Sequence, residues 1–211
     1  ERKEAAQTAA SYFDLSLRYA LLGSTPKVLA FMGRVGTGKS TLARRLQSSL
    51  NVRRFSTDRI RKALGNMPLR QRTPAVRRDE LYSASMSART YNKLMERARA
   101  TVQKGMSVIL DGTFNSESSR KRLQQLAHEE DVELVFIEAQ APDVVIKQRL
   151  RNREEQQDVV SDARLEDFEK LDDRYEPPEE VDDQELIRVN TDGEINQTIS
   201  QLYTLLADRQ C

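Results

Sequence analysis

A short run of glycines followed by a lysine and a serine has the residue types that hold a phosphate group. After Gly33 come four residues and then Gly38, Lys39 and Ser40, the spacing of the Walker A, or phosphate-binding (P-loop), pattern. Together with Gly36, the glycines let the backbone curl so that successive N–H groups point at one anion. Lys39 would reach the β- and γ-phosphates, and the Ser40 hydroxyl would bind Mg²⁺. The pattern predicts a nucleoside triphosphate site; the alternative is a glycine-rich turn that holds no ligand.

The segments around this pattern have the character that a phosphate site needs. Residues 28–32 are apolar and suit a buried parallel strand, and residues 41–46 continue as a helix. A helix that begins near Lys39 directs its free N–H groups and the positive end of its dipole toward the same anion. The strand, loop and helix therefore predict one continuous phosphate-binding unit.

Two aspartates follow later predicted strands. Asp58 ends the strand at 52–58 and lies three residues before Arg61, so both share a helix face. Asp58 could accept the proton of an attacking hydroxyl, and Arg61 could hold an anionic acceptor; the alternative for Asp58 is a helix N-cap. Asp111 ends the strand at 106–111 and could hold Mg²⁺ through water beside Ser40, or else form a turn with the glycine that follows. That glycine replaces the second acid of motor-type ATPases, which disfavours dedicated ATP hydrolysis.

Two arginines lie four residues apart on the predicted helix at 142–153. Arg149 and Arg153 would both face the site if this segment folds over it as a lid, where arginines neutralise a transferring phosphoryl group. The alternative is a surface helix with ion pairs to Glu154 and Glu155.

Strands and helices alternate along the chain, which predicts an α/β fold with a parallel sheet between two layers of helices. We expect strands at 28–32, 52–58, 106–111, 132–137 and 186–190, and the main helices at 2–22, 58–64, 79–104 (broken near 83–87), 116–130, 142–153, 162–175 and 194–207, with an irregular loop at 65–78. Ligands of such sheets bind beyond the carboxyl ends of the strands. Asp58, Asp111, the glycine loop and the corner at 190–192 should therefore meet at one edge.

The N-terminal helix carries a broad apolar stripe of Ala5, Ala9, Tyr12, Phe13, Leu17, Ala20 and Leu21. We expect residues 1–25 to pack on the surface of the following domain; the alternative is a connector from an upstream domain. Residues 26–211 are predicted to form one P-loop domain with a lid around 149–163.

Composition excludes several classes of protein. The 211 residues carry a net charge of +1, so bulk charge does not indicate a nucleic-acid-binding protein. A basic segment at 53–78 and an acidic one at 154–185 are expected to be solvated surface. Cys211 and His128 are single residues of their types, which excludes a disulfide framework and Cys- or His-based metal sites. With no membrane span or signal peptide evident, we expect a cytoplasmic protein.

Taken together, these motifs resemble the small-molecule and polynucleotide kinase branch of P-loop proteins. The sequence looks most similar to the kinase-type ATP-binding modules often fused behind an aminoglycoside-phosphotransferase-like domain, with polynucleotide 5′-kinases and zeta-type toxins as more distant relatives. The resemblance covers about residues 26–190 and rests on 33–41, 56–62, 108–114, 149–153 and 161–163. It implies a three-layer P-loop NTPase fold with a kinase-type lid.

The resemblance also implies roles for individual residues. Asp58 would be the base, Lys39 and Arg153 would act on the transferring phosphoryl group, and Arg149 would pack near the nucleotide base. Contacts to ATP are implied for Gly33, Gly36, Thr37, Gly38, Lys39, Ser40 and Thr41, contacts to Mg²⁺ for Ser40 and Asp111, and contacts to the acceptor for Arg61, Asp111 and Thr113.

The sequence therefore predicts an ATP- and Mg²⁺-dependent kinase that phosphorylates a hydroxyl of an anionic acceptor: a nucleic-acid 5′ end, a nucleotide or a small metabolite. The alternative is a nucleotide-dependent regulatory module with little turnover. A GTPase is disfavoured because residues 190–192 lack the lysine and the spacing of the guanine-reading motif.

Overall fold

A five-stranded parallel sheet forms the centre of the molecule in the computed structural model, which describes residues 2–155 and 160–210. Its strands are β1 (Lys27–Met32), β2 (Arg53–Ser56), β3 (Val108–Asp111), β4 (Glu133–Gln140) and β5 (Leu186–Asn190), in the order β2-β3-β1-β4-β5. Every pairing is parallel. The predicted α/β fold with a parallel sheet is confirmed.

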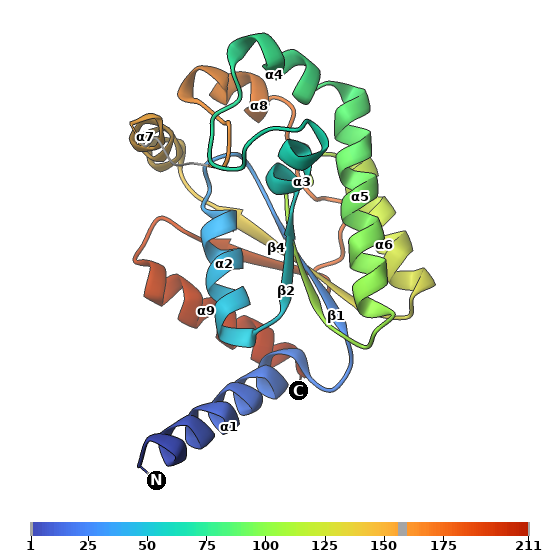
Figure 1. Cartoon of the computed structure of the whole chain (residues 1–211), viewed down its shortest axis with the longest axis vertical. Helices are drawn as coiled ribbons and strands as arrows, with labels where there is room; N and C mark the ends of the chain where they lie inside the picture. Colours follow the sequence, from blue (N-terminus) through green and yellow to red (C-terminus); the bar gives the residue numbers. More distant parts are fainter. Residues whose placement is uncertain (1, 156–159, 211) are drawn as a thin grey trace.

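Helices cover both faces of this sheet (Figure 1). One layer holds α1 (Arg2–Leu22), α2 (Lys39–Leu50) and α9 (Ile195–Ala207), and the other holds α3 (Thr57–Leu64), α5 (Ala84–Val102) and α6 (Glu117–Glu129). Successive residues of a strand point to opposite faces, so Leu29 and Phe31 of β1 pack with the first layer, and Val28 and Ala30 with the second. Two separate cores result, and the fold has the predicted three layers.

Four further elements cover the carboxyl ends of the strands. These are α4 (Ala75–Leu81), α7 (Asp143–Glu154), the 3₁₀ turn η1 (Leu165–Asp167) and α8 (Phe168–Asp172), which lie above the sheet in Figure 1. Ile146 and Leu150 of α7 pack against Phe168 in a small third core that also takes in Val35 of the glycine loop. Helices α7 and α8 are therefore packed on the glycine loop that they cover.

Two predicted helices differ from those observed. The helix expected over 79–104 forms as α4 and α5, with the break expected near 83–87 found at Tyr82 and Ser83, but α4 begins at Ala75, inside the loop expected over 65–78. The Ser83 hydroxyl caps α5 by accepting from the N–H of Met86 at 3.2 Å. The helix expected over 162–175 is wrong, since only η1 and α8 form there. Its first residue, Asp162, instead accepts the backbone N–H of Thr73, which holds this end of the segment in an extended connection.

Helix α1 forms as expected, but its packing differs from the expectation. Leu21 and Leu22 in its last turn are buried against α2 and α9, whereas Tyr12, Phe13 and Tyr19 are 68%, 69% and 57% exposed. The side chain of Ala5 lies outside those described, as does Cys211. Surface packing is thus limited to the end of the helix, and the connector role stays a prediction. Within the described part of the chain, no helix has the length and apolar character needed to cross a membrane.

Candidate nucleotide and phosphoryl-transfer site

The glycine loop between β1 and α2 has backbone angles that require glycine. Gly33 and Gly36 have φ angles of 124° and 77°, in the left-handed region that side chains disfavour. A Cβ atom on Gly33 would lie 2.6 Å from the carbonyl oxygen of Ala139, and one on Gly36 would lie 2.8 Å from Cγ2 of Ile146. The loop is therefore pressed between the end of β4 and helix α7, and it closes around the first turn of α2.

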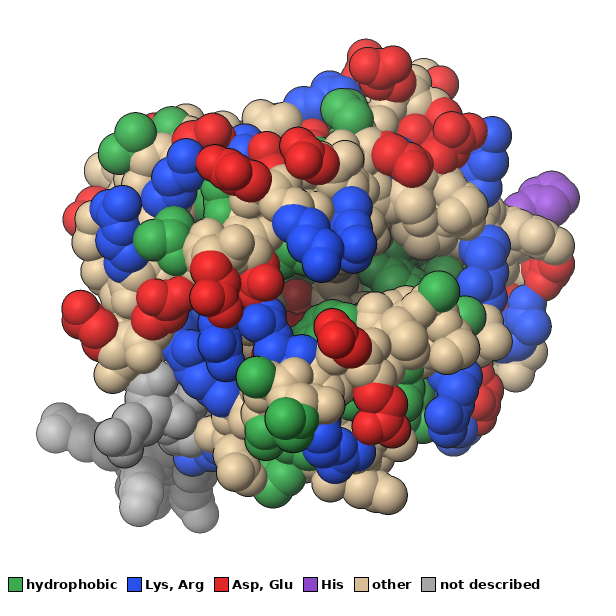
Figure 2. Space-filling model, turned by 90° about the horizontal axis from the view of Figure 1, so that it is seen from above, with side chains coloured by type: hydrophobic (Ala, Val, Ile, Leu, Met, Phe, Trp, Pro, Cys, Tyr) green, Lys and Arg blue, Asp and Glu red, His purple; other side chains and the backbone are tan. Residues whose placement is uncertain are grey.

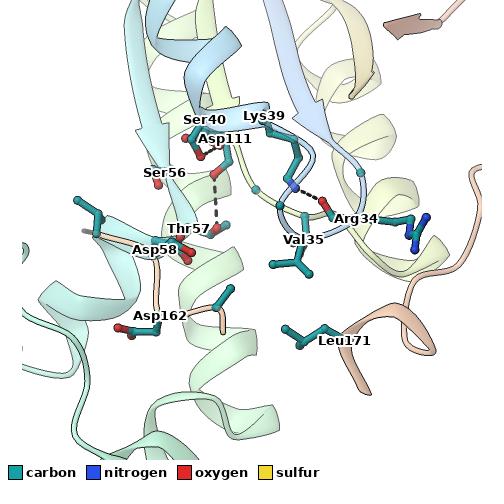
Figure 3. Close-up of a pocket in the computed structure, with 18 of the residues that line it drawn as sticks. Arg34, Val35, Lys39, Ser40, Ser56, Thr57, Asp58, Asp111, Asp162 and Leu171 are labelled. Carbon is teal, nitrogen blue, oxygen red and sulfur yellow. Dashed lines mark hydrogen bonds between the residues drawn. The ribbon is translucent and has the colours of Figure 1, made fainter. Parts of the chain in front are cut away.

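The Lys39 side chain folds back into this loop (Figure 3). Its ammonium group donates to the carbonyl of Arg34 and lies 3.4 Å from the hydroxyl of Thr37, which itself donates to the same carbonyl at 2.8 Å. Burial lowers the pKa of Lys39 to about 8, although the nearby carboxylates of Asp111 and Asp58 act in the opposite direction. Within residues 2–155 and 160–210, the hydrogen-bond partners of this buried ammonium group are a backbone carbonyl and a hydroxyl, so an anion placed beside it would be favourable.

Ser40, in the first turn of α2, meets Asp111 at the end of β3. The Ser40 hydroxyl donates to Oδ1 of Asp111 at 2.9 Å, and Nη1 of Arg54 donates to Oδ2 at 2.6 Å. Arg54 is itself held by Gln47, whose Oε1 accepts from Nε at 3.0 Å. Asp111 is therefore a hydrogen-bonded carboxylate at the sheet edge, as its place at the end of a strand predicted.

These oxygens suit Mg²⁺ better than a metal that needs a full protein cage. Mg²⁺ prefers hard oxygen ligands and usually keeps waters and substrate phosphates beside one or two protein groups. Ser40 and Asp111 supply such oxygens next to the glycine loop. No cluster of three or more His, Cys, Asp or Glu side chains that could hold a metal occurs in residues 2–155 and 160–210. The residues present thus fit a metal that arrives with a nucleotide.

Asp58 lies in the first turn of α3, where Ser56 and not Asp58 is the N-cap residue. Burial raises the pKa of Asp58, and the charges of Asp111 and Asp162 add to this, while Arg61 and a hydrogen bond with Ser161 act in the opposite direction. In Figure 3 its carboxylate lies between the Ser40–Asp111 pair and Asp162. The structure thus places a carboxylate of raised proton affinity beside the phosphate loop.

Arg61 is held within the protein more firmly than the sequence indicated. It is buried, its Nη1 donates to the carbonyl of Leu81 at 3.0 Å and to the hydroxyl of Ser87 at 3.1 Å, and its guanidinium lies 4.8 Å from the ring centre of Tyr82. Thr113, its expected neighbour on the acceptor side, lines the same cavity and has its hydroxyl 3.4 Å from that of Tyr91.

The two arginines of α7 face the cavity, but they have different partners. Arg149 donates to the hydroxyl of Thr191 at 3.1 Å and also to its carbonyl, and Thr191 in turn donates to the carbonyl of Thr37 at 2.6 Å. Burial lowers the pKa of Arg153, against the opposing influence of Asp58. Among the described residues, neither arginine is paired with Glu154 or Glu155. The expected alternative, a surface helix with local ion pairs, is therefore not what forms; residues 156–159 of the predicted lid lie outside the described residues.

The basic segment is solvated surface only in part, at Arg53, Arg59 and Arg70, which corrects the expectation for 53–78. Several of its cationic groups are bound within the protein: Arg72 donates to the carbonyl of Arg153, Arg77 to that of Gly65 at 3.0 Å, and Arg78 pairs with Asp167. Part of the physical reason is the acidic segment, in which Asp162 lies opposite Lys62, and Glu166 and Asp167 lie opposite Arg78. Arg72 and Arg77 are held by backbone carbonyls instead.

One cavity of about 1150 Å³ joins these parts. Figure 2 looks down on this end of the molecule and shows Lys and Arg side chains around the central hollow. Of the predicted site residues, the cavity is lined by Gly33, Gly36, Gly38, Lys39, Ser40, Thr41, Asp58, Arg61, Asp111, Thr113, Arg149 and Arg153. Thr37 does not line it, because its hydroxyl turns to Arg34. Sequence reasoning assigned no role to Arg54, Tyr82, Asp162 or Thr191, which reach the cavity from four different elements or loops.

This sheet, its glycine loop and the cavity at the strand ends define a P-loop nucleotide-binding protein with a kinase-like fold. The model of the AAA domain family matches residues 28–178, and the chain belongs to this family. The resemblance to P-loop kinases predicted from the motifs is thereby confirmed.

Similar proteins agree with this class. Uncharacterized proteins of Mycobacterium tuberculosis and Mycobacterium bovis are 32% identical over 126 residues, which is 60% of this chain and 25% of each relative. The chain thus spans about a quarter of the length of these curated relatives. In fold, it is similar to a gluconokinase from Sinorhizobium meliloti (TM-score 0.62, 16% identity, 87% of this chain and 93% of that one). It is also similar to Kti12 from Chaetomium thermophilum in complex with ADP-AlF3 (TM-score 0.64, 18% identity, 87% and 99%).

Proposed function

We propose that this chain is an ATP- and Mg²⁺-dependent phosphotransferase that moves the γ-phosphoryl group of ATP to a hydroxyl of an anionic acceptor. The observation that carries the proposal is the position of Asp58. Its carboxylate lines the same cavity as Lys39 and Arg153, close enough that its charge acts on the pKa values of both groups. A protein that only binds a nucleotide has no use for this partly buried carboxylate, because a negative charge beside phosphates is unfavourable.

The proposed reaction uses these groups in one displacement. Asp58 takes the proton of the acceptor hydroxyl, the hydroxyl oxygen forms a bond to the γ-phosphorus, and the bond to the β-phosphate oxygen breaks as ADP leaves with its electron pair. Lys39 and Arg153 stabilise the negative charge on the phosphoryl oxygens. Ser40 and Asp111 would hold Mg²⁺, which when bound neutralises charge on the β- and γ-phosphates. Arg149, which Thr191 holds beside the loop, would contact the nucleotide.

The acceptor would enter on the Asp58 side of the cavity. Arg59 and Arg61, which follow Asp58 on α3, line this side, which supports an acceptor that carries negative charge. Tyr82 is the aromatic residue next to Arg61 there. The candidate acceptors are a nucleic-acid 5′ end, a nucleotide and a small phosphorylated or carboxylated metabolite.

The test is transfer of label from γ-labelled ATP in the presence of Mg²⁺. The anionic acceptors would be 5′-hydroxyl oligonucleotides, nucleotides, nucleotide sugars and sugar acids, and label on nucleosides or aminoglycosides, which carry no negative charge, would contradict an anionic acceptor. Asp58→Asn would be tested beside the wild type. The exposed Asp173→Asn is the matched control, because it removes the same charge outside the cavity. We expect label on one class of acceptor, lost in Asp58→Asn and kept in Asp173→Asn. Tight ATP binding without transfer to any class would contradict the proposal and favour the regulatory alternative.

A further inference from the structure

Asp162 lies at the meeting point of three separate segments of the chain. The residue is 4% exposed, and its carboxylate accepts from the backbone N–H of Thr73 at 2.9 Å, the Thr73 hydroxyl at 2.5 Å and the Tyr82 hydroxyl at 3.1 Å. The ammonium group of Lys62 lies 3.3 Å away. We call this group of four residues the clasp.

The clasp contains a buried ion pair, since the Asp162 and Lys62 side chains are 3% and 1% exposed. Lys62 also donates to the carbonyls of Leu69 and Gln71, at 3.4 Å and 2.7 Å. Burial alone would raise the pKa of Asp162, but the hydrogen bonds from Thr73 and the charge of Lys62 bring it below its ordinary value, so the group stays ionised. Buried ion pairs add little net stability, and they are better explained by the single arrangement that they enforce.

That arrangement fixes the loop before α4 against the chain that follows α7. Beside Thr73, Arg72 donates to the carbonyl of Arg153 in the last turn of α7. Further along, Arg78 of α4 pairs with Asp167 of η1. The loop thus holds both the end of α7 and the segment after it.

The clasp also borders the groups around Asp58. Lys62 is four residues after Asp58 on α3, and Ser161, beside Asp162, lowers the pKa of the Asp58 carboxyl. Tyr82 lies under the guanidinium of Arg61. One set of contacts therefore joins the surroundings of the base to the backbone that carries Arg153.

We propose that Asp162 is a positioning residue that fastens the chain after α7 to the acceptor side, so that Arg153 and Asp58 are held at one transferring phosphoryl group. This rests on the proposed function. Removal of the Asp162 charge should leave the glycine loop intact, since no clasp residue belongs to it. The change should therefore lower affinity for a transition-state mimic and not for the nucleotide itself.

The first arm of the test measures dissociation constants for ADP, and for ADP with Mg²⁺ and aluminium fluoride, by calorimetry. Aluminium fluoride takes the place of the transferring phosphoryl group. In Asp162→Asn we expect the affinity for ADP to stay within about twofold of wild type. The increase in ADP affinity that aluminium fluoride causes, called the gain below, should be reduced about tenfold or more. Arg153→Ala should show the same loss, whereas Asp173→Asn should show none. Thr73→Val, which keeps the backbone donor, is a milder second variant for the case that Asp162→Asn does not fold.

The second arm measures hydrogen exchange in residues 69–73 and 160–172 without any ligand, so it does not depend on catalysis. We expect exchange there to be about tenfold faster in Asp162→Asn and unchanged in Asp173→Asn. Unchanged exchange in Asp162→Asn and Thr73→Val would overturn the clasp. Faster exchange with a full gain from aluminium fluoride would overturn the positioning role. No gain in the wild type would instead contradict the proposed phosphoryl transfer, while the exchange arm would still decide the clasp.

Discussion

The guanidinium of Arg54 holds one carboxylate oxygen of Asp111 at 2.6 Å, while the other oxygen accepts from Ser40 at 2.9 Å. Arg54 therefore offsets the charge of Asp111 and leaves the oxygen next to Ser40 on the side of the glycine loop. With its charge offset in this way, Asp111 attracts a divalent cation weakly on its own. The metal site should become strong only when nucleotide phosphates add their charge.

Replacement of Arg54 by glutamine should strengthen metal binding in the absence of nucleotide. Loss of one nearby positive charge should tighten Mn²⁺ binding about 3- to 10-fold, which can be measured by electron paramagnetic resonance of free Mn²⁺. Arg53→Gln is the matched control, because this exposed neighbour on β2 changes the net charge equally. Equal affinities in Arg54→Gln and wild type would show that Arg54 does not control the metal site.

The affinity for ATP should fall as the pH rises above about 8. Burial lowers the pKa of Lys39 to about 8 in the free protein, and bound phosphates favour its protonated form. ATP binding above that pH must therefore take up a proton, and the affinity should fall by up to about tenfold per pH unit. Calorimetry at pH 8.5 in two buffers of different ionisation enthalpy would detect the uptake. In Lys39→Met the affinity for ATP should be weaker than in the wild type and should not fall further as the pH rises above 8. An equally steep fall in this variant would show that the proton taken up on ATP binding belongs to another group.

Asp58→Asn should stabilise the free protein at neutral pH, although it is expected to abolish transfer. A carboxyl whose pKa is raised in the folded state binds protons more tightly there than in the unfolded chain, so stability is lost as pH rises through the folded pKa. A neutral amide avoids this loss. We expect a gain of about 1 kcal/mol at pH 7.5, or about 2–4 °C in Tm, measured by calorimetry.

The sign of that effect can be checked by lowering the pH. Below the unfolded pKa both states of the wild type carry a neutral Asp58, so the gain from Asp58→Asn should shrink toward zero. A variant less stable than the wild type at pH 7.5 would show that Asp58 has a net stabilising role and that its pKa is not raised.

Gly36→Ala should destabilise the protein more than Gly105→Ala. Both glycines have positive φ angles, 77° and 69°, so both changes carry a similar backbone penalty of about 1 kcal/mol. The new Cβ at Gly36 would lie 2.8 Å from Ile146, whereas nothing lies within 4 Å at Gly105. Gly36→Ala should therefore lose about 1–3 kcal/mol more, together with ATP affinity. Equal changes in the free energy of unfolding would mean that α7 does not press on the loop.

Residues that directly follow strands could be placed from the sequence. Gly33, Asp58 and Asp111 each stand at or just after the end of a strand, and parallel strands end at one edge. The buried strand β1 could also be predicted, because its hydrophobic pattern determines it locally.

Contacts carried by irregular segments could not be placed in this way. Asp162 and Thr73 are 89 residues apart, and neither lies in a helix or a strand whose direction could be predicted. The segment after Asp162 has helical composition, but the tertiary contacts of Asp162 and the packing of Phe168 outweigh that propensity. Arg54 is absent from the predicted site for a related reason, since it follows Arg53 in a basic segment that is typical of ordinary surface charge.

The decisive measurement is the single-turnover rate of phosphoryl transfer to the acceptor that the panel identifies, compared between wild type and Asp58→Asn. Both proteins would be at saturating Mg²⁺ and equally occupied by γ-labelled ATP. We predict that Asp58→Asn binds ATP within about twofold of wild type and transfers label at least about 10²-fold more slowly. Transfer at the wild-type rate in Asp58→Asn would contradict the assignment of Asp58 as the base and, with it, the proposed organisation of the site.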